Sequence, residues 1–289
     1  MATAPASGPP QAGTPSLWRA VRAHRGMNLF LGLLLLCFLL GPWIIPFSPT
    51  DIEPERILLP PGFPFVFGTD EFGRDVFSRI VAGTQPTLLP AFASAALGVL
   101  LGTATGLFAG YHGGRLDDAV MRLMDVLMSF PALILAMLIV VMTGPSMINV
   151  VLAIGVVFWP RSARLVRSAV LDLARREFID ACRARGESVF YILRHELLPN
   201  TWAIIAVDFS LRASYGILLS ASLSYLGIGV KAPTPAWGLM VKDAQQFIQI
   251  APWLVIFPCL AISVVSIGAV MFGERLRRAV SVAGERGSR

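Results

Sequence analysis

The strongest constraint on the fold of this chain is a set of long apolar runs without charge. Residues 126–160 contain no Asp, Glu, Lys, Arg or His. A helix crosses the bilayer core of about 30 Å with about 20 apolar residues, so this run can supply two crossings. Only 15% of all residues are charged, and the mean hydropathy is +0.68, whereas soluble domains carry about 25% charged residues. The sequence therefore predicts an all-α polytopic membrane protein.

Charges and turn residues divide the apolar runs into six predicted transmembrane helices. The Thr-Gly-Pro-Ser turn at residues 143–146 divides the longest run. The six helices are predicted at about residues 27–47, 88–109, 124–142, 147–166, 202–227 and 251–272. The other predicted parts are a disordered tail (1–26), a polar loop (48–87), a charged loop at about 168–200 inside the five-helix core (88–273), and a C-terminal tail (274–289).

The distribution of Lys and Arg predicts the orientation in the membrane. Of the 24 such residues, 18 lie in the two tails, the turn near residue 115 and the stretch 161–194, and 5 lie in the loops 48–87 and 228–249. The positive-inside rule places the richer side in the cytoplasm. Both termini are thus expected to be cytoplasmic and the loop 48–87 extracytoplasmic. The same rule accounts for the net charge of +6 without a nucleic-acid partner.

The residues that bind metals or catalyse reactions form no recognisable pattern. Neither the three cysteines nor the three histidines are grouped, so no metal site or disulfide framework is expected. A phosphate-binding loop needs Gly-Lys before Ser or Thr, but Lys231 and Lys242 each follow Val. We therefore expect no catalytic residue, no metal and no cofactor in this chain.

Several local motifs carry more information. One is Gly-Thr-Asp-Glu-Phe-Gly-Arg-Asp-Val-Phe-Ser-Arg at 68–79, and another is Ser-Tyr-Leu-Gly-Ile-Gly-Val-Lys-Ala-Pro-Thr-Pro-Ala-Trp-Gly at 224–238. The glycines of the first permit tight turns, and its charged residues can pair across the turn. The motif is expected to be structural through Gly68, Thr69, Asp70, Gly73, Arg74 and Asp75. Trp237 in the second suits a membrane interface.

Two further features concern the helices. Glycines at 98, 102, 106 and 110 lie on one helix face and predict close helix packing. The charged segment Arg-Glu-Phe-Ile-Asp-Ala-Cys-Arg-Ala-Arg-Gly-Glu-Ser at 176–188, followed by Leu-Leu-Pro-Asn at 197–200, lies between two apolar segments. It is poorly suited to lipid, and we expect it to dock in another protein, although a helix lying on the lipid headgroups is the alternative.

Together these segments resemble the permease subunits of bacterial ABC importers, in particular the C-type subunit of the dipeptide, oligopeptide and nickel group. The resemblance rests on the motif at 68–79, on Leu-Ser-Tyr-Leu-Gly at 223–227, on Pro-Thr-Pro-Ala-Trp-Gly at 233–238 and on the charged segment. It covers about residues 27–279. Three residues depart from the family pattern: Asp180 replaces Glu, Cys182 replaces Ala, and Glu196 replaces an apolar residue.

The resemblance implies a type I permease fold and a set of partners. These are a second, B-type permease in a heterodimer, two ATP-binding subunits that hold ATP and Mg, an extracytoplasmic substrate-binding protein and the lipid bilayer of the inner membrane. It also implies that the charged segment couples to the ATPase. The residues expected to do so are Arg176, Glu177, Asp180, Ala181, Arg183, Ala184, Gly186, Leu198 and Pro199.

Asp208 and Arg212 lie four residues apart inside the fifth predicted helix. Charges within a membrane span are costly, so a mutual ion pair is the simpler interpretation. The alternative is a role in lining the pathway, where Arg212 meets a peptide carboxylate or the partner permease.

The resemblance favours import of peptides, with nickel chelates, glutathione or other small solutes as alternatives. A secondary transporter driven by an ion gradient and a non-transporting scaffold are less favoured. Secondary transporters usually carry several intramembrane acids, and neither class needs the charged segment.

Overall fold

The computed structural model describes the backbone of residues 25–287 and the side chains of residues 32–278 except 33, 35 and 42. The predicted disorder of the N-terminal tail falls almost entirely outside these residues. The described residues form helices and turns, and their only β pairing is an isolated bridge between Thr69 and Asp75. The expectation of an all-α chain is confirmed.

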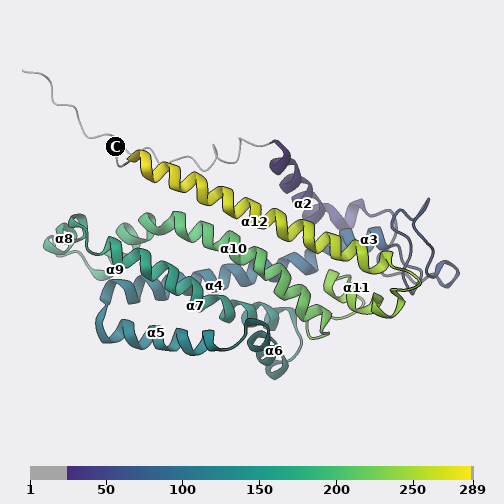
Figure 1. The fold of residues 1–289 in the computed structure, drawn as a ribbon, viewed down its shortest axis with the longest axis horizontal. Helices are drawn as coiled ribbons and strands as arrows, with labels where there is room; N and C mark the ends of the chain where they lie inside the picture. Colours follow the sequence, from purple (N-terminus) through teal and green to yellow (C-terminus); the bar gives the residue numbers. More distant parts are fainter. Residues whose placement is uncertain (1–24, 288–289) are drawn as a thin grey trace, which may run out of the picture.

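Most of the long helices lie roughly along one direction (Figure 1). The helices are α2 (Arg25–Ile44), α3 (Val76–Ala82), α4 (Thr84–His112), α5 (Gly114–Ser129), α6 (Ala132–Thr143), α7 (Met147–Leu173), α8 (Glu177–Ala184), α9 (Val189–Tyr191), α10 (Leu198–Tyr225), α11 (Trp237–Ala244) and α12 (Trp253–Gly287). Short turns η1 (Pro54–Arg56), η2 (Ile192–Leu197) and η3 (Gln245–Phe247) join them.

Six helical units fit the six predicted crossings. Four helical stretches are long and apolar enough to cross a membrane, namely Val76–His112, Met147–Leu173, Val189–Tyr225 and Trp253–Arg278. The bent pair of α5 and α6 adds a fifth unit. The apolar α2, of 20 residues, supplies a sixth.

The third predicted helix, at about residues 124–142, is broken in the structure. The chain bends by 89° between α5 and α6. The break falls at Phe130 and Pro131, where Phe130 is extended with φ −83° and ψ 136°. Proline disfavours helical geometry in the residue before it and lacks a backbone N–H. The charged α5 is therefore separated from the wholly apolar α6.

Other boundaries also differ from the sequence-based ones. Helical structure begins at Val76 within the predicted loop 48–87, because the Asp75 carboxylate caps α3 by accepting from the Ser78 amide at 2.8 Å. At the other end, α12 continues through the predicted C-terminal tail to Gly287. Helix α7 extends seven residues beyond its predicted end, to Leu173.

The centre of the bundle is the contact of α4 with α7. A Cβ atom added at Gly102 would lie 2.4 Å from the Ser162 Cβ, and one at Gly98 would lie 2.6 Å from the Phe158 Cβ. Gly106 and Gly110 meet the next turns of α7 in the same way. The predicted close packing of the glycine face is confirmed, and α4 and α7 form one tightly joined pair.

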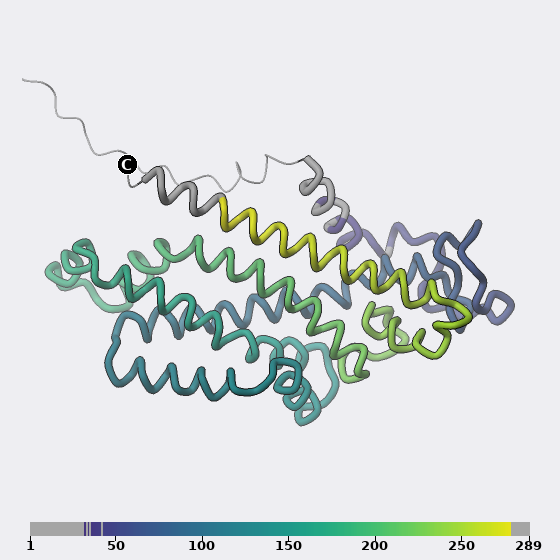
Figure 2. Tube along the Cα trace, in the orientation of Figure 1, coloured from purple at the N-terminus to yellow at the C-terminus, as the bar shows by residue number. Residues whose placement is uncertain are grey.

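The two ends of the bundle carry different structures. Helix α8 lies at one end, and α3, α11 and the connection between α2 and α3 lie at the other (Figures 1 and 2). The end that carries α8 corresponds to the side that the sequence predicts to be cytoplasmic, and the opposite end corresponds to the predicted extracytoplasmic side. The candidate sites identified from the sequence lie at these two ends or between them.

Candidate functional site

The charged segment folds into a short helix that rests on the end of the bundle. Helix α8 is amphipathic and buries Ile179 and Cys182 completely or nearly so. These side chains join a cluster that includes Val166 and Val170 of α7 and Ile192 of η2. This contact surface is apolar, so α8 is held to the bundle by hydrophobic packing.

The opposite face of α8 is open. Most of the residues expected to couple to an ATPase are exposed, namely Arg176, Glu177, Asp180, Ala181, Arg183, Ala184, Gly186 and Pro199, whereas Leu198 is half-buried. Gly186 follows the helix with φ +75°, and a Cβ there would meet no atom within 4 Å. The left-handed conformation ends α8 and suits glycine.

Two charged residues of α8 have partners within the chain. Arg183 Nη1 lies 3.1 Å from Asp180 Oδ1, and its guanidinium carbon lies 5.1 Å from the centre of the Tyr111 ring at the end of α4. This cation–π geometry ties the open face of α8 to α4. The sequence did not indicate Tyr111, because it lies far from the charged segment along the chain.

The connection from α8 to α10 is also more specific than expected. Ser188 caps α9 by accepting from the Tyr191 amide at 3.2 Å, and the chain then forms the π-helical turn η2. Single π-helical turns inside longer helices occur often at functional sites. Pro199 stands in the first turn of α10, directly after this π-helical turn.

At the opposite end, the motif at 68–79 forms a compact cap. Gly68 and Gly73 have φ of +76° and +77°, and a Cβ at Gly73 would lie 1.9 Å from the Glu53 carbonyl oxygen. Asp70 accepts from the amides of Phe72 and Arg74 at 2.9 Å. Its carboxylate also pairs with Arg74 at 2.7 Å, so each residue type in this turn has a structural reason.

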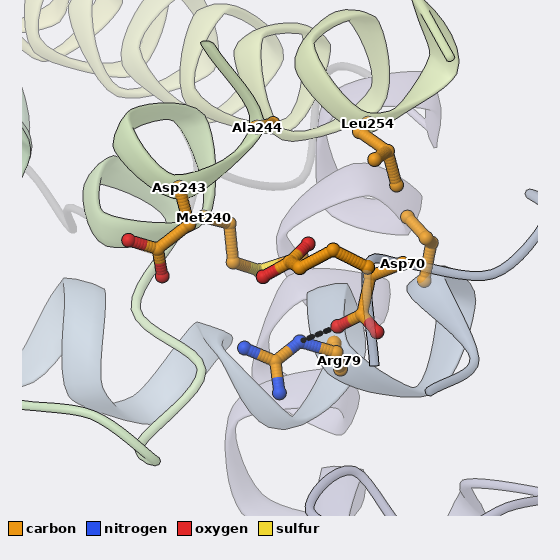
Figure 3. Close-up of a pocket in the computed structure, with 8 residues that line it drawn as sticks. Asp70, Arg79, Met240, Asp243, Ala244 and Leu254 are labelled. Atoms are coloured by element: carbon orange, nitrogen blue, oxygen red, sulfur yellow. Dashed lines mark ion pairs between the residues drawn. The ribbon is translucent and has the colours of Figure 1, made fainter. Parts of the chain in front are cut away.

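The cap is bound to the connection that precedes it and to α3. Thr69 accepts from the Leu59 amide at 2.8 Å and donates to the Arg56 carbonyl. Arg79 pairs with Asp70 at 3.3 Å and donates to the Pro49 carbonyl at 2.8 Å. Asp243 of α11 lines a small cavity beside this pair and so lies close to the cap (Figure 3).

Trp237 does not lie at a membrane interface as expected. Its side chain is buried, and its indole N–H donates to the Ile80 carbonyl at 2.8 Å. The backbone N–H of Trp237 donates to Thr87 Oγ1 at 3.0 Å. The indole fixes α11 against α3, and the backbone N–H of the same residue fixes it against α4, which explains why a bulky aromatic residue stands between Ala236 and Gly238 in this motif.

Two carboxyl groups that line the cavity have raised pKa values. Burial raises the pKa of the Glu71 carboxyl and that of Asp243. A carboxyl whose pKa rises on folding stabilises the folded state below its ordinary pKa, and this contribution is lost as pH rises through the raised pKa. We expect the cap to resist thermal unfolding slightly better at mildly acidic than at neutral pH.

Asp243→Asn is expected to reduce this pH dependence and to raise the apparent Tm slightly at neutral pH. The effect is small because Asp243 is partly exposed and screened by solvent. Thermal unfolding of the purified complex at several pH values measures it. An unchanged pH profile in the variant would contradict the assignment.

Asp208 and Arg212 are in contact within α10. Arg212 Nη2 lies 2.9 Å from Asp208 Oδ1, and both side chains are largely buried. Ser162 of α7 donates to the other Asp208 oxygen. The guanidinium carbon of Arg212 lies 5.9 Å from the Phe158 ring of α7. The pair thus also joins α10 to α7, a contact for which the sequence gave no signal.

We expect Arg212→Ala to lower the amount of assembled complex in the membrane, without changing substrate choice. The variant leaves the buried Asp208 carboxylate uncompensated, which costs about 3–5 kcal/mol. Quantification of the complex after mild solubilisation, together with competition uptake, separates the two effects. The double variant Asp208→Asn, Arg212→Gln is the control and should recover much of the loss. A stable Arg212→Ala complex with an altered substrate range would favour the pathway role instead.

The fold, the membrane helices and the motifs define an integral-membrane transport component. The chain belongs to the family of binding-protein-dependent transport system inner membrane components, whose model matches residues 102–282. It is therefore a multi-pass membrane protein with a transport role, in a system that uses ATPase and binding-protein partners.

Several permease proteins are similar to this chain over most of its length. The dipeptide transport system permease protein DppC of Alkalihalophilus pseudofirmus is 41% identical over 85% of this chain and 81% of its own length. The di/tripeptide permease DppC of Pseudomonas aeruginosa is 35% identical, with 97% and 96% covered. The glutathione transport system permease protein GsiD of Pectobacterium atrosepticum is 36% identical, with 91% and 89% covered.

A chain of the MetNI methionine ABC transporter, solved in inward-facing conformations, has a similar fold. The TM-score is 0.59 at 21% sequence identity, covering 70% of this chain and 96% of that one. The expected ABC importer permease fold is confirmed.

Proposed function

We propose that this chain is the C-type permease subunit of an ATP-driven importer and forms half of the translocation pathway for di- or oligopeptides. The observation that carries the proposal is α8, which rests on the bundle through Ile179 and Cys182 and presents an open face with Ala181 and Ala184. Small side chains allow a partner to approach closely. The names of the relatives support peptides as the cargo.

In this proposal α8 docks into a groove of an ATPase subunit. Closure of the ATPases on ATP then moves α8 as a rigid body. The apolar contacts between α8 and the bundle transmit this motion to α4 and α7. Arg176, Glu177, Asp180 and the residues around Gly186 form the docking face. ATP and Mg belong to the two ATPase subunits, and this chain itself catalyses no reaction.

The remaining partners are a B-type permease that completes the pathway as a heterodimer and an extracytoplasmic binding protein that delivers the peptide. Both termini of this chain lie in the cytoplasm. Support comes from the excess of Lys and Arg on that side and from the place of α8 at one end of the bundle and the cap at the other (Figure 1).

The test is uptake by the complete complex in vesicles that hold no ion gradient. We expect accumulation of a labelled dipeptide only with ATP inside the compartment that contains the ATPases, and co-purification of two ATPase subunits. Uptake that needs a proton or sodium gradient, or a complex without an ATPase, would contradict the proposal.

Glutathione is the second candidate cargo, because a glutathione permease is 36% identical to this chain. Competition of labelled dipeptide uptake by glutathione distinguishes the two. The binding protein selects the cargo in this type of system, so its ligand decides between them.

A further inference from the structure

One face of α7 is open and contains polar groups. On α7 this face carries Arg161, Arg164, Leu165 and Ser168, which are exposed and recur every three to four residues. The opposite side of α7 packs on the glycines of α4. On α10 the large exposed side chains are Trp202, Tyr215, Leu218 and Tyr225. The Asp208–Arg212 pair joins the two helices through Ser162 and Phe158.

Arg161 differs from the other arginines within these two spans. Arg164 pairs with Asp125 and Arg167 with Asp117, both on α5. Arg212 pairs with Asp208. Among the residues that the structure describes, Arg161 has no ion pair, hydrogen bond or aromatic contact, although its side chain is exposed. A full positive charge is therefore available on this open face.

The depth of Arg161 makes a lipid environment unfavourable. Its neighbour Ser162 contacts Gly102 of α4, ten residues before the end of α4 at His112. At 1.5 Å per residue this is about 15 Å from that end, well inside a bundle that crosses a core of about 30 Å. An arginine at such a depth usually faces water or a partner group.

The outward side of α12 has a different composition. Up to Met271, its large exposed side chains are all apolar, namely Ile256, Leu260, Val264, Ile267, Val270 and Met271. Such a surface suits lipid tails. Helices α7 and α10 also expose apolar side chains, such as Ile148 and Leu218, but among the six predicted spans exposed arginines occur only on α7. The part of α7 around Arg161 therefore suits an aqueous or protein-lined space.

We propose that the Arg161 guanidinium contacts the substrate in the translocation pathway, where it binds a carboxylate of the passing peptide. A guanidinium can hold a carboxylate through two parallel hydrogen bonds. Arg212, already neutralised by Asp208, adds little net attraction, so binding stays weak enough for release. This inference rests on the proposed function, because it takes the cargo to be a peptide.

The test uses the complete complex in vesicles and compares Arg161→Gln and Arg161→Lys with Arg115→Gln. Arg115 is the matched control, since it is exposed at the start of α5 and outside the open face. We expect Arg161→Gln to lower the initial rate of dipeptide uptake about tenfold, because a charge-assisted hydrogen bond is lost. Arg161→Lys should keep most of the rate, and Arg115→Gln all of it. ATP hydrolysis stimulated by the loaded binding protein should remain in every variant.

A second variant, Arg161→Cys, tests the sign of the charge. Aminoethyl methanethiosulfonate restores a positive charge and should restore uptake, whereas the sulfonatoethyl reagent should lower uptake further. Saturating dipeptide should slow both reactions. The unsubstituted complex, which contains Cys37, Cys182 and Cys259, gives the background of the treatment.

Three results would overturn the proposal: wild-type uptake by Arg161→Gln, equal effects of the two reagents, or a cysteine at 161 that does not react in the assembled complex. The last would show that the partner permease covers Arg161. If the wild-type complex itself shows no ATP-driven peptide uptake, the proposed function fails, and this inference fails with it. That result is distinct from an effect confined to the variants.

Discussion

Gly186→Asp is expected to abolish ATP-driven uptake while leaving the amount of protein in the membrane unchanged. The Cβ position of Gly186 faces open space within this chain, so the new carboxylate meets no atom of the bundle. In the proposed complex it projects into the groove of the ATPase, where a desolvated, unpaired charge and a steric clash oppose docking. Uptake assays and immunoblots of membrane fractions measure the two effects.

Gly186→Ala is the control, because it separates backbone strain from the clash. Both variants place a non-glycine residue at φ +75°, and Asp tolerates left-handed geometry better than Ala. If strain alone mattered, Ala would be the worse of the two. We expect Ala to retain most of the uptake. Full uptake by Gly186→Asp would remove the coupling role from this segment.

Gly102→Val is expected to prevent stable folding of the permease. A Cβ at this position would lie 2.4 Å from the Ser162 Cβ and 2.8 Å from the Ala163 amide nitrogen. Neither neighbour is the flexible end of a side chain, so α4 and α7 must separate. Overpacking of this kind typically costs about 1–3 kcal/mol and occasionally more, and here the clash involves backbone atoms and a Cβ atom. The measurable result is strong loss of the chain from membranes and of the purified complex.

Gly32→Val in α2 is the matched control, since a Cβ there would meet nothing within 4 Å. It introduces the same residue type into a membrane helix without a close neighbour. We expect normal accumulation of this variant. Equal losses from both variants would show that the cost comes from valine in a membrane helix and not from the contact between α4 and α7.

The sequence predicted the long-range organisation well because charge and hydropathy directly determine which segments can cross a bilayer. The length of the uncharged run at 126–160 predicted two membrane-crossing segments, and the glycines at four-residue spacing predicted a closely packed neighbouring helix. What the sequence did not show is which helix would be that neighbour. The partner is α7, and its small Ser162 and Ala163 meet the glycines.

Local backbone geometry was harder to predict. The bend before α6 depends on a single proline, and the same residue type is tolerated inside α4 and α7. The pattern around residue 131 did not distinguish these cases. The burial of Trp237 depends on carbonyl and hydroxyl groups of α3 and α4, which lie about 150 residues away in the chain.

For the candidate sites, too, the sequence predicted some features and not others. The exposed face of α8 was predictable, because charged and small residues alternate with Ile179 and Cys182 at helical spacing. The contacts of α8 with Tyr111 and of Asp208 with Ser162 join residues on different helices. Such contacts follow from packing, so the sequence alone contains no local signal for them.

Docking of α8 on an ATPase subunit can be tested by site-specific cross-linking from the open face of α8. A cysteine introduced at Asp180, an exposed position, is treated in the assembled complex with a short bifunctional reagent, and the products are identified by mass spectrometry. We expect cross-links to an ATPase subunit that change with bound ATP, and labelling of this cysteine only from the cytoplasmic side. Labelling from the extracytoplasmic side, or a complex in which Asp180→Cys never reaches an ATPase, would contradict it.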